Sequence, residues 1–133
     1  MGTKMTYADV EAGVRASIAA YTQALDDGRT DDIIATFCAD GVCDIPGMGT
    51  HEGHDALREA YAGLQPRRPQ RHVVVNTLVT KWDEHEATAI SDVIFLLQRE
   101  SGWAIQVVGR YHDTLHHDAG TWRFHRRAAT FVT

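Results

Sequence analysis

The order of residue patterns along the chain predicts an α+β fold, in which helices from the first half cover one face of a curved antiparallel sheet from the second half. Apolar residues recur at helical spacing up to about residue 64, and four β-rich runs follow, separated by short turns. At 133 residues the chain is long enough to bury a core without disulfides or metal. We therefore expect one domain over residues 1–133.

The first helix is predicted from Ala8 to Asp27, and Gly28 stands where such a helix ends. Its apolar residues follow one another at spacings of four, four, three and four, the stripe of an amphipathic helix: Val10, Val14, Ile18, Tyr21 and Leu25. This stripe should face the sheet.

Two shorter helices are predicted after Gly28. The first runs from an N-cap at Thr30 to about Cys38 and ends at Asp40-Gly41. A short strand from Val42 to Ile45 and a turn-rich stretch lead to another helix, whose apolar face is formed by Leu57, Tyr61 and Leu64.

The remaining chain reads as four strands, at residues 70–82, 86–99, 103–116 and 121–131. Turn-like residues separate them, so antiparallel hairpins are the natural pairing. The strands are longer than the usual five or six residues, which suits a sheet that bends strongly around its helices. Such a sheet can close a pocket against the first helix.

Composition and charge exclude several classes of partner. The formal net charge of −5 disfavours nucleic acid, and the single basic cluster at residues 67–71 has no interleaved aromatic residues that could stack on bases. No apolar run approaches the ~20 residues of a membrane span. Cys38 and Cys43 form no disulfide framework and the first residues do not resemble a signal peptide, so a cytoplasmic location is expected.

Four segments, in their order and spacing, resemble the nuclear transport factor 2-like superfamily and, within it, the SnoaL-like family. They are YTQALDDGRTDDIIATFCADG at 21–41, IPGMGTHEGHDAL at 45–57, RHVVVN at 71–76 and GRYHDTLHHDAGTWRFHRR at 109–127. The resemblance covers nearly the whole chain. It implies a cone-shaped α+β barrel with a pocket between the sheet and the N-terminal helices.

The closest functional likeness is to elimination enzymes of that superfamily: scytalone dehydratase, hexachlorocyclohexane dehydrochlorinase and the bile acid 7α-dehydratases. It implies a catalytic dyad of Asp26 and His72, with Arg127 assisting the leaving group. Tyr21 is similar to a tyrosine of the bile acid enzymes, where the dehydrochlorinase has lysine. Asp92 is similar to a further aspartate of the bile acid enzymes and is expected to bind substrate.

The residues themselves support acid/base chemistry. Histidine is a base near neutral pH, and a carboxylate on its far nitrogen fixes the tautomer and stabilises the imidazolium. Asp26 also lies at the negative end of a helix dipole, where a carboxylate is unfavourable. Simpler interpretations stay open: a solvated Asp26, a structural His72, a surface Arg127 and an outward-facing Asp92.

Two aromatic residues have a structural alternative as well. Tyr21 lies on the core stripe of the first helix, so plain packing with a satisfied hydroxyl explains it equally well. Tyr111 is expected in the core or in the wall of the pocket, where it would contact the substrate.

Eight histidines suggest a metal site, with two groups of candidate ligands: His51 and His54, or His112, His116 and His117. Neither group has a standard zinc spacing, and no nucleophile motif occurs. We therefore expect neither a metal nor a cofactor.

Together these features predict a cofactor-independent lyase that eliminates water, or a comparable group, from a hydrophobic alicyclic, polyketide or steroid-like molecule. Isomerisation or cyclisation in the same pocket is an alternative, because it begins with the same proton removal. A non-catalytic ligand-binding or assembly module is the other alternative. A homo-oligomer, dimer or trimer, is expected.

Overall fold

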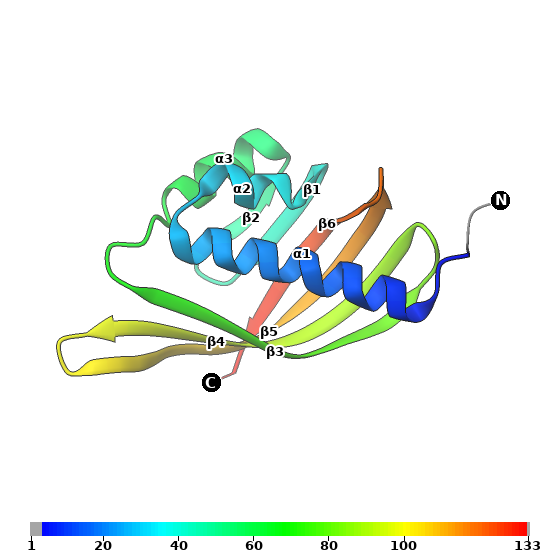
Figure 1. The fold of residues 1–133 in the computed structure, drawn as a ribbon. Helices are drawn as coiled ribbons and strands as arrows, with labels where there is room; N and C mark the ends of the chain where they lie inside the picture. The colour runs from blue at the N-terminus through cyan, green and yellow to red at the C-terminus, as the bar shows by residue number, and fades with distance from the viewer. Residues whose placement is uncertain (1–3, 133) are drawn as a thin grey trace.

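The computed structural model describes residues 4–132 and confirms the α+β fold with N-terminal helices and a strongly curved sheet (Figure 1). Helix α1 lies across the concave face of the sheet, and two short helices pack beside its C-terminal end. The elements follow one another as α1 (Tyr7–Asp27), α2 (Thr30–Ala35), β1 (Phe37–Ile45), β2 (Gly49–Glu52), α3 (His54–Ala62), β3 (Gln70–Trp82), β4 (Glu86–Arg99), β5 (Gly102–Asp118) and β6 (Thr121–Phe131).

The six strands form one sheet in the order β2-β1-β6-β5-β4-β3. Strands β3 to β6 make an antiparallel meander, as the turn signals predicted. The sheet as a whole is mixed, because β1 pairs with β6 in parallel. The antiparallel sheet predicted for the second half of the chain is confirmed, and the parallel pair adds β1 from the first half to its edge.

Helix α1 has clear start and stop signals. Thr6 caps its N-terminus in a capping box with Asp9, and Gly28 takes the left-handed conformation at its C-terminus, with φ of 70°. The predicted apolar stripe is buried against the sheet. This burial fixes the rotation of the helix about its axis, so Asp26 at its end faces β3.

The second helix is shorter than predicted. It ends at Ala35, and Arg29, whose side chain makes no capping bond, precedes its first residue Thr30. The chain from Phe37 onward is a strand because it pairs with β6, beginning with Phe37 opposite Phe124. Pairing with a distant strand overrode the local helical pattern.

Strand β3 contains an irregularity that changes which residues share a face. Its register shifts between Val75 and Leu78, and Asn76 there has φ of 57°. Strict alternation of side chains along a strand predicts that Asn76 and Leu78 share the face of His72. The bulge reverses this, so that Leu78 is exposed and Val79 is buried.

The core lies between α1, the two short helices and the concave face of the sheet. A cluster of aromatic rings fills its centre: Tyr21, Phe37, Tyr61, Tyr111 and Phe124. Among residues 4–132, the helices lack the length and apolar character needed to cross a membrane.

Candidate active site

Asp26 and His72 are in direct contact, although they lie 46 residues apart in the sequence. The distance from His72 Nδ1 to Asp26 Oδ1 is 2.6 Å, and the backbone N–H of His72 donates to Asp26 Oδ2 at 2.7 Å. Gln70, two residues earlier on the same face of β3, donates a third hydrogen bond to Asp26 at 3.1 Å. The end of α1 and the start of β3 thus hold one carboxylate from three directions.

These hydrogen bonds keep Asp26 charged. Its side chain is only 5% exposed, and burial alone would raise its pKa. The bonds from the His72 ring, the His72 backbone and Gln70 outweigh burial and lower the pKa below the ordinary value. Asp26 is therefore an anion at neutral pH.

An anionic Asp26 determines which nitrogen of His72 carries the proton. Nδ1 must donate to the carboxylate, so the neutral ring keeps its lone pair on Nε2. The ring is stacked on Phe95 of the neighbouring strand, with centroids 4.4 Å apart and planes at 15°. Asp26 fixes the tautomer and Phe95 fixes the ring plane.

His72 opens onto an apolar cavity of about 370 Å³ between α1 and the concave sheet. The volume lies within the usual range for small-molecule sites. Apart from Gln70 and His72, its walls are aliphatic, aromatic or glycine: Tyr21, Leu25, Ile45, Pro46, Gly47, Met48, Tyr61, Leu64, Val93, Phe95, Val107, Tyr111, Ala129 and Phe131.

A second hollow of about 550 Å³ borders Asp26 and His72 between α1 and β3. Its lining is more polar and includes Arg15, Gln23 and Arg71. The ring of His72 is stacked on Phe95, and Phe95 lines the apolar cavity but not the second hollow. We therefore take the apolar cavity as the candidate site of the chemistry.

Tyr21 and Tyr61 form a hydroxyl pair in the cavity wall. Their oxygens are 2.6 Å apart, and the oxygen of Tyr61 lies 3.1 Å from Cys43 Sγ. Burial raises the pKa of both tyrosines well above the ordinary value. Both therefore keep their protons, so the pair can donate a hydrogen bond but not act as a base.

Arg127 lies behind this wall and does not line the cavity. Its side chain is 0% exposed, and its guanidinium carbon lies 3.5 Å from the ring centre of Tyr111 and 4.2 Å from that of Tyr21. Arg127 Nε is 3.3 Å from Asp113 Oδ1. Within residues 4–132, neither side chain of this ion pair has a partner with hydrogen-bond geometry.

Arg127 and Asp113 interact through their charges, without a hydrogen bond between them. Burial raises the pKa of Asp113 to about 6 although the adjacent Arg127 lowers it. Burial works against the charge of Arg127, but Asp113 and the surrounding tyrosines outweigh it and raise the pKa of the guanidinium. A fixed positive charge thus lies directly behind Tyr21 and Tyr111.

The predicted role of Asp92 is not supported. Asp92 pairs with Val75 and Arg110 and points to the opposite face of the sheet from its neighbour Val93, which lines the cavity. There it accepts hydrogen bonds from Arg110 at 2.9 Å and Asn76 at 3.1 Å. Tyr111 is placed in the cavity wall as expected.

Four residues of the site were not identified from the sequence: Tyr61, Gln70, Phe95 and Asp113. Gln70 and Asp113 each carried a signal, because they stand two positions from His72 and Tyr111 and so share their faces. Tyr61 was visible only as part of a helix stripe. Phe95 depended on the strand register, which the sequence does not give.

The two groups of histidines that the sequence analysis weighed as metal ligands are placed as follows. His51 is hydrogen-bonded to the backbone oxygen of Met48, and His54 to that of Phe37. His112 is hydrogen-bonded to Thr130 on an exposed strand face. No metal site therefore forms from the groupings that the sequence suggested among residues 4–132.

The chain was compared with known proteins in sequence and in fold. No curated protein matches the chain. A solved structure of a protein of unknown function from Mycobacterium tuberculosis is 24% identical, with a TM-score of 0.87, and the alignment covers 96% of this chain and 78% of the other.

Two further solved structures share the fold. A Novosphingobium aromaticivorans protein to which scytalone dehydratase activity is ascribed is 23% identical, with a TM-score of 0.82 over 92% of this chain and 84% of the other. A type 2 hexachlorocyclohexane dehydrochlorinase is 15% identical, with a TM-score of 0.80 over 93% and 86%.

The family itself is decided by a model of the SnoaL-like domain, which matches residues 6–128. That match spans the helices, the cavity and nearly all of the sheet. The chain belongs to the SnoaL-like domain family, with the nuclear transport factor 2-like cone fold.

Proposed function

We propose that the protein is a cofactor-independent lyase that eliminates water from a hydrophobic hydroxylated molecule, of alicyclic, polyketide or steroid-like type. The observation that carries the proposal is the 2.6 Å contact between Asp26 and His72 at the wall of an apolar cavity. A base of this kind acts at neutral pH without a metal.

His72 Nε2 is the base in the proposed reaction. It takes a proton from a carbon next to the one that carries the hydroxyl group, and the electron pair of that C–H bond forms the new double bond. The C–O bond breaks at the same time or, where a carbonyl group is attached to the carbon that loses the proton, after an enolate intermediate. Asp26 stabilises the imidazolium that forms on His72.

The departing oxygen needs a proton to leave as water. The Tyr21 and Tyr61 hydroxyls lie in the cavity wall and keep their protons, so they are suited to bind that oxygen. The proton can come from the imidazolium, which returns His72 to its starting state. Arg127 does not touch the cavity, so its role is to position Tyr21 and Tyr111 and to favour negative charge near them.

The cavity wall also limits the substrate. Among residues 4–132, the polar side chains that line the cavity are His72, Gln70 and the three tyrosines, Tyr21, Tyr61 and Tyr111. A substrate with one or two oxygen atoms on an otherwise apolar ring system matches this distribution, whereas a charged substrate would lose its solvation without gaining a partner.

A mass-spectrometric screen tests the proposal. The purified protein is incubated with a panel of hydroxylated alicyclic, polyketide and steroid compounds, and products lighter by one water molecule are sought. The His72→Ala variant should not form them, and Asp92→Asn, changed on the opposite sheet face, should form them at the wild-type rate. Equal product formation by wild type and His72→Ala would exclude the mechanism.

Isomerisation or cyclisation is the second candidate, because it shares the first proton transfer. Incubation in heavy water separates the two: an isomerase exchanges substrate hydrogen with solvent without losing water. A ligand that binds the cavity but undergoes neither change would instead support a binding module.

We also propose that the protein forms a homo-oligomer through the outer face of the sheet. The aliphatic side chains on that face that are more than one third exposed include Val73, Val75, Ile105 and Val108. Such a patch is typical of a contact with another chain. Light scattering coupled to gel filtration measures the mass of the protein in solution. The double variant Val75→Lys, Ile105→Lys should have the mass of one chain.

A further inference from the structure

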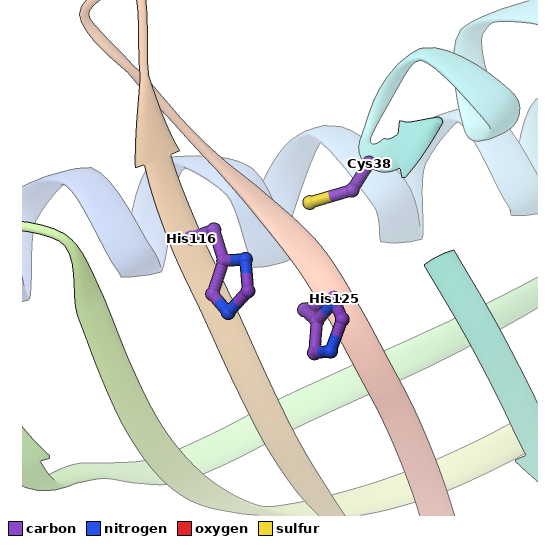
Figure 2. A group of neighbouring side chains, drawn as sticks. All are labelled: Cys38, His116 and His125. Atoms are coloured by element: carbon purple, nitrogen blue, oxygen red, sulfur yellow. The ribbon is translucent and has the colours of Figure 1, made fainter. Parts of the chain in front are cut away.

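Three side chains of types that ligate metals meet outside the apolar cavity, where β1, β6 and β5 run side by side. Figure 2 shows Cys38 from β1, His116 from β5 and His125 from β6 directed toward a common region. One ligand atom from each, a thiol sulfur or ring nitrogen, lies within 4.8 Å of both others. None of the three lines the apolar cavity.

Strand irregularities produce this cluster. In β6, Phe124 pairs with Leu115 and Arg126 with Thr114, so His125 is the extra residue of a bulge. In β1 the register shifts between Phe37 and Val42, which releases Cys38 from regular pairing. Two adjacent bulges therefore turn Cys38 and His125 toward the same point.

The donor atoms are available to an ion. Nδ1 of His125 is buried and has no hydrogen-bond partner within residues 4–132, although Asp40 Oδ1 lies 3.9 Å away. The Cys38 thiol donates only a long hydrogen bond within residues 4–132, 3.6 Å to the carbonyl of Arg123. A buried polar atom without a partner is costly, so a ligand that satisfies it is favoured.

Solvent can reach the cluster. The side chains of His116 and His125 are 38% and 39% exposed, and a surface hollow of about 790 Å³ borders Cys38, Asp40 and His116. Two carboxylates flank the rings, Glu86 at 3.5 Å from His116 and Asp40 beside His125. Their negative charge attracts a cation.

We propose that Cys38, His116 and His125 bind a zinc ion. One sulfur and two imidazole nitrogens are a donor set that zinc prefers, and Asp40 or a water molecule completes the tetrahedron. The two rings are now stacked, with centroids 4.1 Å apart and planes at 12°. Parallel rings cannot both direct in-plane lone pairs at one ion, so binding turns them about their side-chain bonds.

The thiol must lose its proton when the ion binds. Burial and the nearby Asp40 raise the pKa of Cys38, so the metal-free thiol is protonated and unreactive. The ion forms a bond to sulfur and releases that proton to solvent. The bound ion ties β1 to the β5–β6 hairpin, and the dyad takes no part in this.

Cobalt titration tests the site, because cobalt(II) replaces zinc and reports its ligands by colour. A 1:1 complex should show a thiolate-to-cobalt charge-transfer band and intense visible bands of a four-coordinate ion, and zinc should bleach both. Cys38→Ser should abolish the charge-transfer band. His116→Gln and His125→Gln should each weaken cobalt binding at least about tenfold. Loss of a residue that only hydrogen-bonds a metal ligand already weakens binding by about that factor.

Matched controls exclude unspecific effects. Cys43→Ser changes the other cysteine, and His112→Gln changes a histidine on an exposed face of the same β5. Both should keep the bands and the affinity. Zinc should also raise the melting temperature of the wild type and not that of Cys38→Ser, because an ion that binds only the folded state stabilises it.

Circular dichroism verifies that each variant is folded before titration. The absence of a charge-transfer band in the folded wild type, or its persistence in Cys38→Ser, contradicts the proposal. Binding that is unchanged in both His116→Gln and His125→Gln also contradicts it.

Discussion

Asp26 and Asp113 are both buried aspartates of one small domain, yet their charge is controlled in opposite ways. The Asp26 side chain is 5% exposed and that of Asp113 is 0% exposed. The pKa of Asp26 is lowered below the ordinary 3.8, whereas that of Asp113 is raised to about 6. Asp26 belongs to the proposed dyad, and Asp113 belongs to the buried layer behind the tyrosines.

Hydrogen bonding accounts for the difference. Asp26 accepts bonds from the His72 ring, the His72 backbone and Gln70. Asp113 has an adjacent cation in Arg127 but accepts no hydrogen bond from residues 4–132. A carboxylate that receives several directed donors tolerates burial as an anion, and a nearby charge alone compensates less.

The largest expected effect is on turnover at the dyad. His72→Ala removes the proposed base and should reduce kcat by about 10²–10⁴-fold. Asp26→Asn keeps the shape but removes the charge that fixes the tautomer, so it should also reduce kcat. Steady-state kinetics on a substrate from the screen measures both.

The double variant distinguishes a dyad from two independent residues. Residues that act as one unit are non-additive, so the double variant should be little slower than the slower single variant. Multiplying effects would show that Asp26 and His72 act separately.

The next effect is on stability in the buried layer. Arg127→Leu leaves Asp113 buried without its counter-charge and should reduce the free energy of unfolding by about 3–5 kcal/mol. Changing the neighbouring Arg126, which makes an exposed ion pair with Asp44, should cost at most about 1 kcal/mol. Urea denaturation compares them.

A second change separates charge from packing in that layer. Combining Arg127→Leu with Asp113→Leu should recover much of the lost stability, because no unpaired charge is left buried. A double variant as unstable as Arg127→Leu would instead assign the loss to packing against Tyr21 and Tyr111.

The pH dependence of stability should reveal Asp113 directly. Because the folded protein binds this proton more tightly, the stabilisation is complete below the unfolded pKa of 3.8 and is lost as pH rises through about 6. Relative to Asp113→Asn, the wild type should lose about 2 kcal/mol between about pH 4 and about pH 7. Parallel stability curves for the two proteins would refute this.

Asp26 should act with the opposite sign. Its pKa is lowered on folding, so its contribution is present above the unfolded pKa and is lost as pH falls through the folded pKa. Relative to Asp26→Asn, the wild type should therefore gain stability as pH rises from strongly acidic values toward neutrality. An unchanged stability difference over that range would argue against the hydrogen-bonded anion.

The smallest effect is expected for Asp92. Its carboxylate is bonded to Arg110 and Asn76 on the face of the sheet away from the cavity. Asp92→Asn should leave both kcat and KM at wild-type values. A clear rise in KM would return Asp92 to the substrate site.

Much of the secondary structure could be predicted because it depends on local patterns. The stripe from Val10 to Leu25 and the stop at Gly28 defined α1, and turn residues separated the four long strands. Two predictions failed where distant pairing decided the outcome. Phe37 and Cys38 became the start of β1, which pairs with β6, instead of extending a helix, and the bulge at Asn76 reversed the faces of β3.

In the candidate site, too, the residues that depend on local features were predicted and those that depend on strand pairing were not. Asp26 and His72 were identified by family resemblance and by the chemistry of the residue types, and their contact requires only that α1 lie along β3. Asp92 was misplaced because a strand assignment does not say which face points inward. That choice depends on the register with neighbouring strands.

The sequence by itself determined the family, the order of the elements and the residue types that can do acid/base chemistry, because these follow from local periodicity and side-chain identity. Only the tertiary structure decided the pKa of Asp26 and Asp113, the place of Arg127 behind the tyrosines and the meeting of Cys38 with His125. Each of these depends on which atoms surround a group in space, and residues far apart in the chain supply those atoms.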